Sequence, residues 1–212
     1  AVLARGTTTI HNAAKEPEIV DLCHFLNEMG AQIHGMGTHR ITINGVKQLK
    51  SICCTVMPAR IVAGTNFAAA AATGGNILAY PVKEKDLRSV LDVFAAMGCG
   101  IIIRRNQLQL IAPPLLLPVE SICTRPFPGF PTDMQSQLMA CLTAARGTSV
   151  ICENIFEDRF KIVPQLEKMG AKILVNENKA VIRGGCRLTG SCVSAQDLRG
   201  GAALVIAGLM AE

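Results

Sequence analysis

The chain has 212 residues, half of them hydrophobic, and its 21 basic and 16 acidic residues give a formal net charge of +5. This length allows one large or two ordinary domains, and the apolar content suffices for a packed core, which excludes a disordered chain. The basic residues are scattered, Arg104-Arg105 is the densest pair, and there is one Tyr and no Trp. We therefore expect no nucleic-acid partner, because that function needs a basic stripe; an anionic small substrate suits the modest positive charge better.

The nine cysteines and four histidines show no metal-binding spacing. There is no CxxC pair, and the histidines at positions 11, 24, 34 and 39 lack the HExxH spacing, so we assign no metal. Most cysteines stand among apolar residues, which predicts reduced core thiols. The chain opens without a signal-like segment, and its longest apolar candidate, 201–211, is about half a membrane crossing. We expect a soluble, cytoplasmic protein with no membrane partner.

A Met-Gly-Ala or Met-Gly-Cys phrase recurs at Met29, Met97 and Met169, each time after an amphipathic segment. The strides are 68 residues (29 to 97) and 72 residues (97 to 169). A repeat of this length exceeds the periods of about 20 to 50 residues that solenoids use, so each copy is expected to be a compact α/β unit. An active site is then expected between such units.

The first 46 residues match only the second half of such a unit. Here the pattern predicts a strand, a helix and two strands, over 8–10, 16–29, 32–34 and 40–43. The second copy matches a whole unit in the order βαβαββ, with 60–63 leading into an alanine-dense helix that Gly74-Gly75 stops. Its expected elements are the helix 64–73, the strand 76–80, the helix 84–97 and the strands 101–104 and 108–112.

The third copy repeats this order, and a fourth is only begun. Its expected elements are the strand 121–124, the helix 133–145, the strand 149–152, the helix 157–169 and the strands 172–175 and 180–183. After it, residues 192–212 predict a short strand and the helix 197–211. The sequence therefore predicts an α/β (α+β) array of repeated modules, incomplete at both ends, and is expected to be the middle of a longer chain.

Two charged residues stand at expected helix starts. Asp133, after the prolines at 126, 128 and 131, suits a plain N-cap, or a carboxylate that takes a proton from a substrate hydroxyl. Arg159 falls in the first turn of the expected helix 157–169, where a cation opposes the helix dipole. Arg159 is therefore either an anion ligand or a partner of Glu157 or Asp158 in an exposed salt bridge.

Two further helix starts carry acidic residues. Asp197 opens the segment Asp-Leu-Arg-Gly-Gly, where it either caps the helix or faces a ligand that approaches the backbone at Gly200-Gly201. Glu16 precedes Pro17 at a helix start, a pattern for which helix formation alone is a sufficient explanation.

Four stretches together closely resemble the UDP-N-acetylglucosamine 1-carboxyvinyltransferase family of enolpyruvyl transferases. They are Asn-Ala-Ala-Lys-Glu-Pro-Glu-Ile-Val-Asp-Leu (12–22), Pro-Gly-Phe-Pro-Thr-Asp-Met-Gln (128–135), Glu-Asn-Ile-Phe-Glu-Asp-Arg-Phe (153–160) and Asp-Leu-Arg-Gly-Gly-Ala-Ala-Leu (197–204). The similarity runs over nearly all 212 residues. It implies an inside-out α/β barrel of two domains, each of three βαβαββ units, with the active site in the cleft between them.

The resemblance also implies a reaction. The enolpyruvyl group of phosphoenolpyruvate moves to the 3′-hydroxyl of UDP-N-acetylglucosamine, without a cofactor, in the first committed step of peptidoglycan synthesis. Asp133 resembles the general base, and Ile155 a backbone contact to the nucleotide sugar. Arg159 resembles a ligand for the phosphate or carboxylate of phosphoenolpyruvate. The remaining matched positions resemble cleft residues of the second domain, Asp197 and Arg199, and of the first, Glu16.

The chain also departs from the family pattern. The family's Lys-Asn pair, its loop cysteine and its last Arg have no counterpart here, and Ala59 stands where the family usually has Asp. The resemblance implies that 1–57 is the last half-module of a first domain and 58–212 a second domain of two modules plus a truncated third, together a central to C-proximal portion. We expect this chain alone to be inactive and to self-associate through exposed module edges.

Two alternatives share the fold. One is the sister transferase that uses shikimate 3-phosphate, against which the wording of the motifs argues. The other is a non-catalytic fragment or degenerate paralogue that acts as a binding module.

Overall fold

The computed structural model describes all 212 residues, which form two compact units. Unit 1 comprises Ala1–Pro58 together with Pro126–Pro128, and unit 2 comprises Ala59–Arg125 and Gly129–Glu212. Each unit has a hydrophobic core of its own. None of the helices is both long and apolar enough to cross a lipid bilayer.

Unit 1 is one helix packed on a three-stranded antiparallel sheet. Its elements are β1 (Thr7–His11), α1 (Pro17–Glu28), β2 (Gln32–His34) and β3 (Arg40–Asn44), and the sheet order is β1-β3-β2. Alternate residues of β2 and β3, namely Ile33, Ile41 and Ile43, are buried with Cys23 of α1. This period of two is what a strand with one covered face requires, and the expected strands and helix of this segment are confirmed.

The first module of unit 2 begins with a helix. Its elements are α2 (Arg60–Ala72), β4 (Asn76–Ala79), α3 (Glu84–Ala96), β5 (Gly100–Arg104) and β6 (Gln107–Ile111), with the sheet order β4-β6-β5. The expectation that 60–63 forms the leading strand is wrong. Ala63 N donates to Ala59 O, which is the i to i−4 bond of a helix, and no strand pairs with this segment.

The second module of unit 2 has the full predicted order. Its elements are β7 (Ile122–Cys123), the 3₁₀ turn η1 (Thr132–Met134), α4 (Gln135–Leu142), β8 (Thr148–Cys152), α5 (Val163–Lys168), β9 (Lys172–Asn176) and β10 (Lys179–Arg183). The sheet order is β7-β8-β10-β9, in which β7 is the one parallel partner. The helix α6 (Leu198–Met210) follows.

Three expectations about this second half need correction. The helix expected over 157–169 begins only at Val163, because Asp158 has the left-handed φ of 57° and Pro164 suits a first turn. The helix expected to reach Ala145 ends at Leu142, and the following Thr143 hydroxyl bonds to Ala140 O. The short strand expected before α6 is absent.

The Met-Gly repeat has the same geometry in all three copies. Gly30, Gly98 and Gly170 have φ of 100°, 89° and 96°, the left-handed conformation in which a helix commonly ends. In each copy the next amide bonds back across the cap: Ala31 N to Leu26 O, Cys99 N to Phe94 O, and Ala171 N to Leu166 O. The periodicity in the sequence therefore marks equivalent helix ends.

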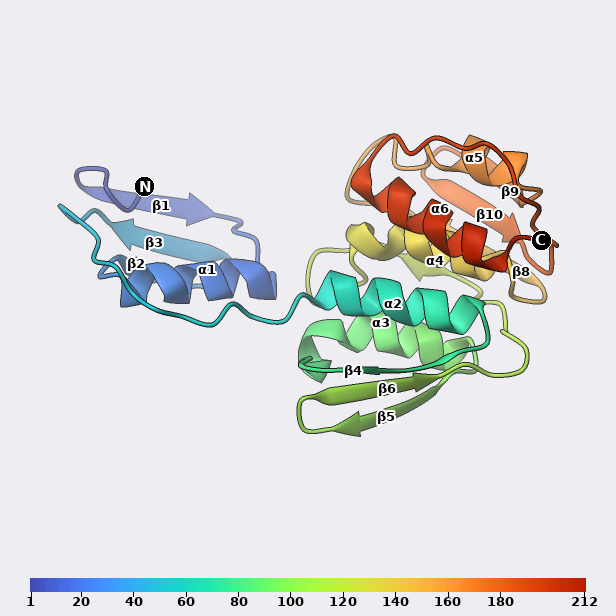
Figure 1. Ribbon diagram of the computed structural model, residues 1–212. Helices are drawn as coiled ribbons and strands as arrows, with labels where there is room; N and C mark the ends of the chain where they lie inside the picture. The colour runs from blue at the N-terminus through green and yellow to red at the C-terminus, as the bar shows by residue number, and fades with distance from the viewer. The chain divides into compact units, whose positions relative to one another are not determined.

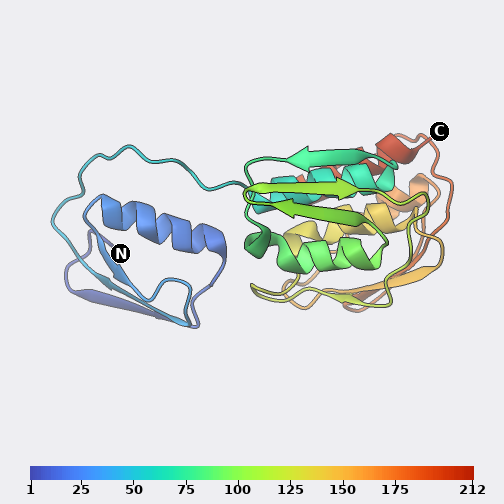
Figure 2. The same ribbon diagram turned by 90° about the horizontal axis from the view of Figure 1, so that it is seen from below.

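The helices α2, α4 and α6 pack against one another in unit 2, with the sheets outside them (Figure 1). All eight residues of α4 are buried. The sheet β4-β6-β5 lies against α2 and α3, as seen in the turned view (Figure 2), and α4 contacts β8 of the other sheet. The predicted α/β class is confirmed. The side chains of the candidate site, described below, lie at the N-terminal ends of the central helices α2, α4 and α6.

Burial divides the cysteines. Cys23, Cys99, Cys141 and Cys152 are buried, whereas the other five are partly or fully exposed, so the expectation that most are core thiols is wrong. Desolvation raises the pKa of Cys99 to about 11 and also raises the pKa of Cys141. These two thiols therefore remain protonated at neutral pH, as inert core residues do.

Candidate functional site

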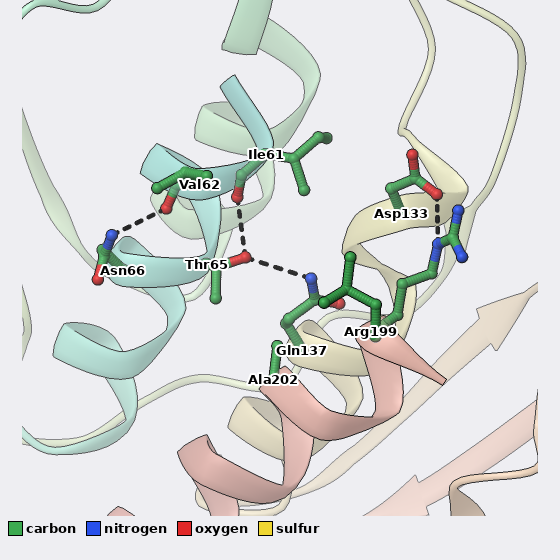
Figure 3. A pocket seen from close by; sticks show the side chains of 9 residues that line it. Ile61, Val62, Thr65, Asn66, Asp133, Gln137, Arg199 and Ala202 are labelled. Atoms are coloured by element: carbon green, nitrogen blue, oxygen red, sulfur yellow. Dashed lines mark hydrogen bonds and ion pairs between the residues drawn. The ribbon is translucent and has the colours of Figure 1, made fainter. Parts of the chain in front are cut away.

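A pocket of about 450 Å³ lies where the first turns of the three central helices of unit 2 meet (Figure 3). Its wall is mostly apolar, and its polar groups come from all three helices. The lining residues are Ile61, Val62, Thr65 and Asn66 of α2, Asp133 and Gln137 of η1 and α4, and Leu198, Arg199 and Ala202 of α6. Helix N-termini carry partial positive charge, so this arrangement suits an anionic ligand.

Asp133 and Arg199 form an ion pair at this pocket. Arg199 Nε donates to Asp133 Oδ1 at 2.5 Å, across 66 positions of sequence, and the second oxygen of Asp133 makes no hydrogen bond (Figure 3). The side chains are 40 % and 34 % exposed, so the pair is accessible to a ligand. The pocket thus presents one free carboxylate oxygen and a guanidinium together.

The capping explanation for Asp133 is wrong. The residue before η1 is Pro131, and the side chain of Asp133 bonds to Arg199 instead of a backbone amide of its own helix. Arg199 stands in the first turn of α6, where the one acidic residue nearby, the N-cap Asp197, bonds to the backbone amide of Gly200. A cation at that place opposes the helix dipole, and the partner that offsets it is Asp133 from another helix.

The wall opposite this pair is closed by α2. Gln137 Nε2 donates to Thr65 Oγ1 at 3.2 Å, and that hydroxyl donates to Ile61 O at 2.8 Å. An added Cβ on Gly64 would come within 2.9 Å of Met134 Sδ, so glycine allows α2 to approach the turn that carries Asp133. The position of this turn therefore depends on close packing as well as on its ion pair.

Arg159 lies in a second, smaller pocket of unit 2. It follows β8 in the irregular segment before α5, in a pocket of about 300 Å³ that also includes Glu153, Glu177 and Asn178. The guanidinium stacks over the Phe156 ring at 4.4 Å from the centroid. It is therefore held by an aromatic face, which leaves its N–H groups available for an anion.

The two sequence arguments about Arg159 are not supported. It is outside α5, so the helix-dipole argument does not apply to it. It forms no salt bridge with Glu157 or Asp158; Asp158 pairs with Lys161 at 2.8 Å, and this hydrogen bond raises the pKa of Lys161. Ile155 lies in the same segment and lines neither pocket.

The remaining candidates are at helix starts. Asp197 caps α6, since its Oδ1 accepts from Gly200 N at 2.7 Å, and this confirms the capping reading. Glu16 precedes α1 in unit 1, and its Oε1 accepts from Phe127 N at 3.5 Å while Oε2 is buried without a partner. The structure thus brings together only Asp133 and Arg199 among the candidates.

Sequence reasoning missed several residues of these pockets. Thr65 and Gln137 carried no motif signal, because a polar residue in a helix pattern is ordinarily assigned to solvent; Gln137 is in fact 2 % exposed. Glu153 was noticed only as part of a motif, although it is 3 % exposed. No group of three His, Cys, Asp or Glu side chains is arranged to hold a metal ion.

The sequence profile of the EPSP synthase (3-phosphoshikimate 1-carboxyvinyltransferase) family matches residues 1–212. A UDP-N-acetylglucosamine 1-carboxyvinyltransferase 1 from Caldanaerobacter subterraneus is 52 % identical over 212 residues, which are all of this chain and 51 % of that protein. A UDP-N-acetylglucosamine 1-carboxyvinyltransferase from Novosphingobium aromaticivorans is 48 % identical, and 49 % of its length is covered. The chain therefore spans about half the length of these relatives.

Two solved structures share the fold. The enolpyruvyl transferase NikO from Streptomyces tendae superimposes with a TM-score of 0.85 at 24 % identity, over 99 % of this chain and 50 % of that one. EPSP synthase from Acinetobacter baumannii gives 0.67 at 18 % identity, over 99 % and 52 %. These likenesses show the architecture of the chain.

Proposed function

The chain belongs to the EPSP synthase family, and on that basis we propose that it forms part of an enolpyruvyl transferase whose acceptor is UDP-N-acetylglucosamine. The acceptor is suggested by relatives named UDP-N-acetylglucosamine 1-carboxyvinyltransferase at 52 % and 48 % identity. In this role the protein acts in the cytoplasm, in the first committed step of peptidoglycan synthesis. Phosphoenolpyruvate is the proposed donor.

The observation that carries this proposal is the Asp133–Arg199 pair at the meeting point of three helix starts. Transfer of an enolpyruvyl group forms a bond between the acceptor oxygen and C2 of phosphoenolpyruvate and breaks the bond from C2 to the phosphate oxygen. The acceptor hydroxyl loses its proton, and the departing phosphate gains one in the balanced reaction. We assign the free oxygen of Asp133 to receive that hydroxyl proton, because nothing else in the unit bonds to it.

The other candidate residues have roles in binding. We assign Arg199 and Arg159 to the anionic groups of the substrates, where a guanidinium binds phosphate or carboxylate through paired N–H groups. Ile155 contributes a backbone contact to the nucleotide sugar, and Asp197 and Glu16 contribute to substrate binding. The capping bond of Asp197 is compatible with this role, since it uses only one carboxylate oxygen.

A chimera tests the proposal. The matching 212 residues of the Caldanaerobacter relative are replaced by this chain, and phosphate release from phosphoenolpyruvate is measured with and without UDP-N-acetylglucosamine. We expect acceptor-dependent release from the chimera and none from the 212-residue chain alone. A folded chimera without acceptor-dependent release would reject the assignment, and turnover by the chain alone would reject the expected need for further sequence.

The family profile favours one alternative acceptor, shikimate 3-phosphate, because its description names that reaction. The effect of each acceptor on the thermal unfolding of the chimera decides between them. We expect UDP-N-acetylglucosamine to protect the protein from thermal unfolding and shikimate 3-phosphate to have no effect.

Self-association of the isolated chain is a further part of the proposal. The edge strands β5 and β9 carry exposed apolar side chains, among them Ile102, Ile103 and Leu174. Exposed apolar edges favour pairing between copies. Sedimentation velocity of the 212-residue chain is expected to show species larger than 22.5 kDa at micromolar concentration, and a monomer at all concentrations would contradict this.

A further inference from the structure

Glu153 is a buried carboxylate with no cationic partner. It directly follows β8, is 3 % exposed and takes part in none of the salt bridges of the structure. Burial of a carboxylate is costly unless hydrogen bonds replace its hydration. Hydrogen-bond donors within the protein must therefore compensate for the lost hydration of the Glu153 carboxylate.

The carboxylate of Glu153 accepts four hydrogen bonds. Oε1 accepts from Thr124 Oγ1 at 2.8 Å, from Ile155 N at 2.9 Å and from Phe156 N at 3.2 Å. Oε2 accepts from Thr132 Oγ1 at 2.8 Å. The direction of the Thr124 bond follows from its surroundings, because the same hydroxyl oxygen accepts from Asn154 N at 2.8 Å. Both oxygens thus accept hydrogen bonds, three at Oε1 and one at Oε2.

These four donors come from three separate segments. Thr124 follows β7, Thr132 opens the turn η1 next to Asp133, and the two amides belong to the irregular segment that holds Ile155 and leads to Arg159. Neither η1 nor the segment 153–162 has the regular hydrogen bonding of a long helix or strand. One carboxylate therefore connects the Asp133 turn with the Arg159 segment.

We infer that Glu153 is a positioning residue that holds the Asp133 turn and the Ile155–Arg159 segment in a fixed mutual arrangement for substrate binding. This inference rests on the proposed function for the identity of the substrate. Its physical basis is that reacting and binding groups must be held closely to their productive geometry, and loops achieve this only through supporting hydrogen bonds. An ionised acceptor is suited to this task because its hydrogen bonds are stronger than those of a neutral amide.

Two substitutions separate the consequences. Glu153→Ala leaves two hydroxyls and two amides without their acceptor, so both segments lose a common anchor. Glu153→Gln keeps one oxygen for Thr124 and the two amides, and its amino group faces a Thr132 hydroxyl that can turn to accept. Glu167→Ala is the matched control, because Glu167 is exposed on α5 and its side chain makes no hydrogen bond or salt bridge to either segment.

The first measurement is amide hydrogen exchange by NMR on the 212-residue chain. We expect Glu153→Ala to accelerate exchange at Ile155 and Phe156 and also at Met134, by about 10- to 100-fold, the range for loss of hydrogen bonds to a charged group. Amides of β8 and β10 should change far less, and Glu153→Gln should restore most of the protection. Unchanged exchange at Met134 in Glu153→Ala would overturn the inference, because the two segments would then not be coupled.

The second measurement is the affinity of each variant for UDP-N-acetylglucosamine by calorimetry. We expect a loss of at least about tenfold in Glu153→Ala, recovery in Glu153→Gln and no change in Glu167→Ala. Equal affinity of Glu153→Ala and the unmodified chain would overturn the inference. If the unmodified chain does not bind this nucleotide sugar, the proposed acceptor fails for the chain, and the exchange measurement alone decides the role of Glu153.

Discussion

The two modules of unit 2 share the order of three antiparallel strands, to which the second module adds the parallel strand β7, but they differ in their helices. In the first, β4-β6-β5 is crossed by α3, a regular helix of 13 residues; in the second, β8-β10-β9 is joined by α5, which has six. The residues that would complete α5 form instead the irregular segment with Ile155 and Arg159. In the same way, α2 has 13 residues, whereas α4 has eight and is preceded by the turn with Asp133.

Three candidate residues, Asp133, Ile155 and Arg159, therefore lie where the second module departs from the first. The regular copy has a solvated face with the exposed ion pairs of Arg88 to Glu84 and Asp92, at 2.8 and 3.0 Å, which contribute little to stability. The irregular copy gives up helical hydrogen bonds and gains side chains directed at pockets. Substitutions made in only one of the two modules can test whether the first module mainly stabilises the fold and the second mainly carries candidate site residues.

The largest expected effect is on turnover. In the chimera, Asp133→Asn keeps the shape of the side chain but cannot take a proton, so turnover should fall by about 10²- to 10⁴-fold, the range for a general base. The control is Asp92→Asn in the regular copy, which should leave turnover unchanged. A large loss of unfolding free energy with near-normal turnover would show instead that Asp133 has a structural role.

The next effect is on stability, and we expect the larger loss of unfolding free energy from a substitution in the regular copy. Phe94 of α3 and Leu166 of α5 are equivalent by their cap bonds, and both are fully buried. Phe94 packs edge-on against Phe67 with centroids 6.5 Å apart, so Phe94→Ala should cost about 3–5 kcal/mol of unfolding free energy. We expect Leu166→Ala to cost about 1 kcal/mol less, within the range for such truncations. Urea unfolding measures both, and an equal or reversed order would contradict the expected difference.

The sequence predicted the regular parts of this fold well. The stride of Met29, Met97 and Met169 located three equivalent helix ends, because a glycine in the left-handed conformation is a local requirement of the chain. The irregular parts were missed for a physical reason. Phe156, Phe160 and Val163 recur at helical spacing across the segment that leads into α5, whereas the left-handed φ of Asp158 is confined to one residue and leaves the apolar periodicity unchanged.

The sequence predicted which residues belong to the candidate site but not which of them contact one another. Asp133 and Arg199 were both singled out from motifs, but their contact joins two helices 66 positions apart, which no local pattern encodes. The capping expectation for Asp133 failed because its carboxylate pairs with Arg199 of another helix and not with a backbone amide. For Asp197 the local capping bond, from Gly200 N, is formed. Glu153 was missed because burial of a carboxylate depends on donors from distant segments.

A smaller effect is expected at the irregular segment of the second module. In the chimera, Arg159→Ala removes the guanidinium that stacks on Phe156 and should raise the KM for phosphoenolpyruvate by about 10- to 100-fold, as loss of a charged hydrogen-bonding group does. Turnover at saturating phosphoenolpyruvate should change much less. Arg88→Ala, on the regular copy, is the control. A change in the affinity for UDP-N-acetylglucosamine with normal phosphoenolpyruvate kinetics would assign Arg159 to the other substrate.

The smallest effect concerns the starts of α2 and α6, which differ in their caps. Asp197 caps α6, whereas α2 begins after Ala59, which offers no side-chain acceptor and is followed by no acidic residue in the first turn. The backbone at Ala59, with φ of −75° and ψ of 103°, already has the extended conformation that a capping residue adopts. Ala59→Asp should therefore add about 0.5–2 kcal/mol to the free energy of unfolding, and Asp197→Ala should remove a similar amount.

The measurement that isolates this cap is amide exchange at Val62, the third residue of α2, whose N–H a cap at position 59 would bind. It should slow in Ala59→Asp and stay unchanged in Ala59→Leu, which adds bulk without an acceptor. If Asp197→Ala is costly and Ala59→Asp brings no protection at Val62, the two helix starts differ in more than their capping residue.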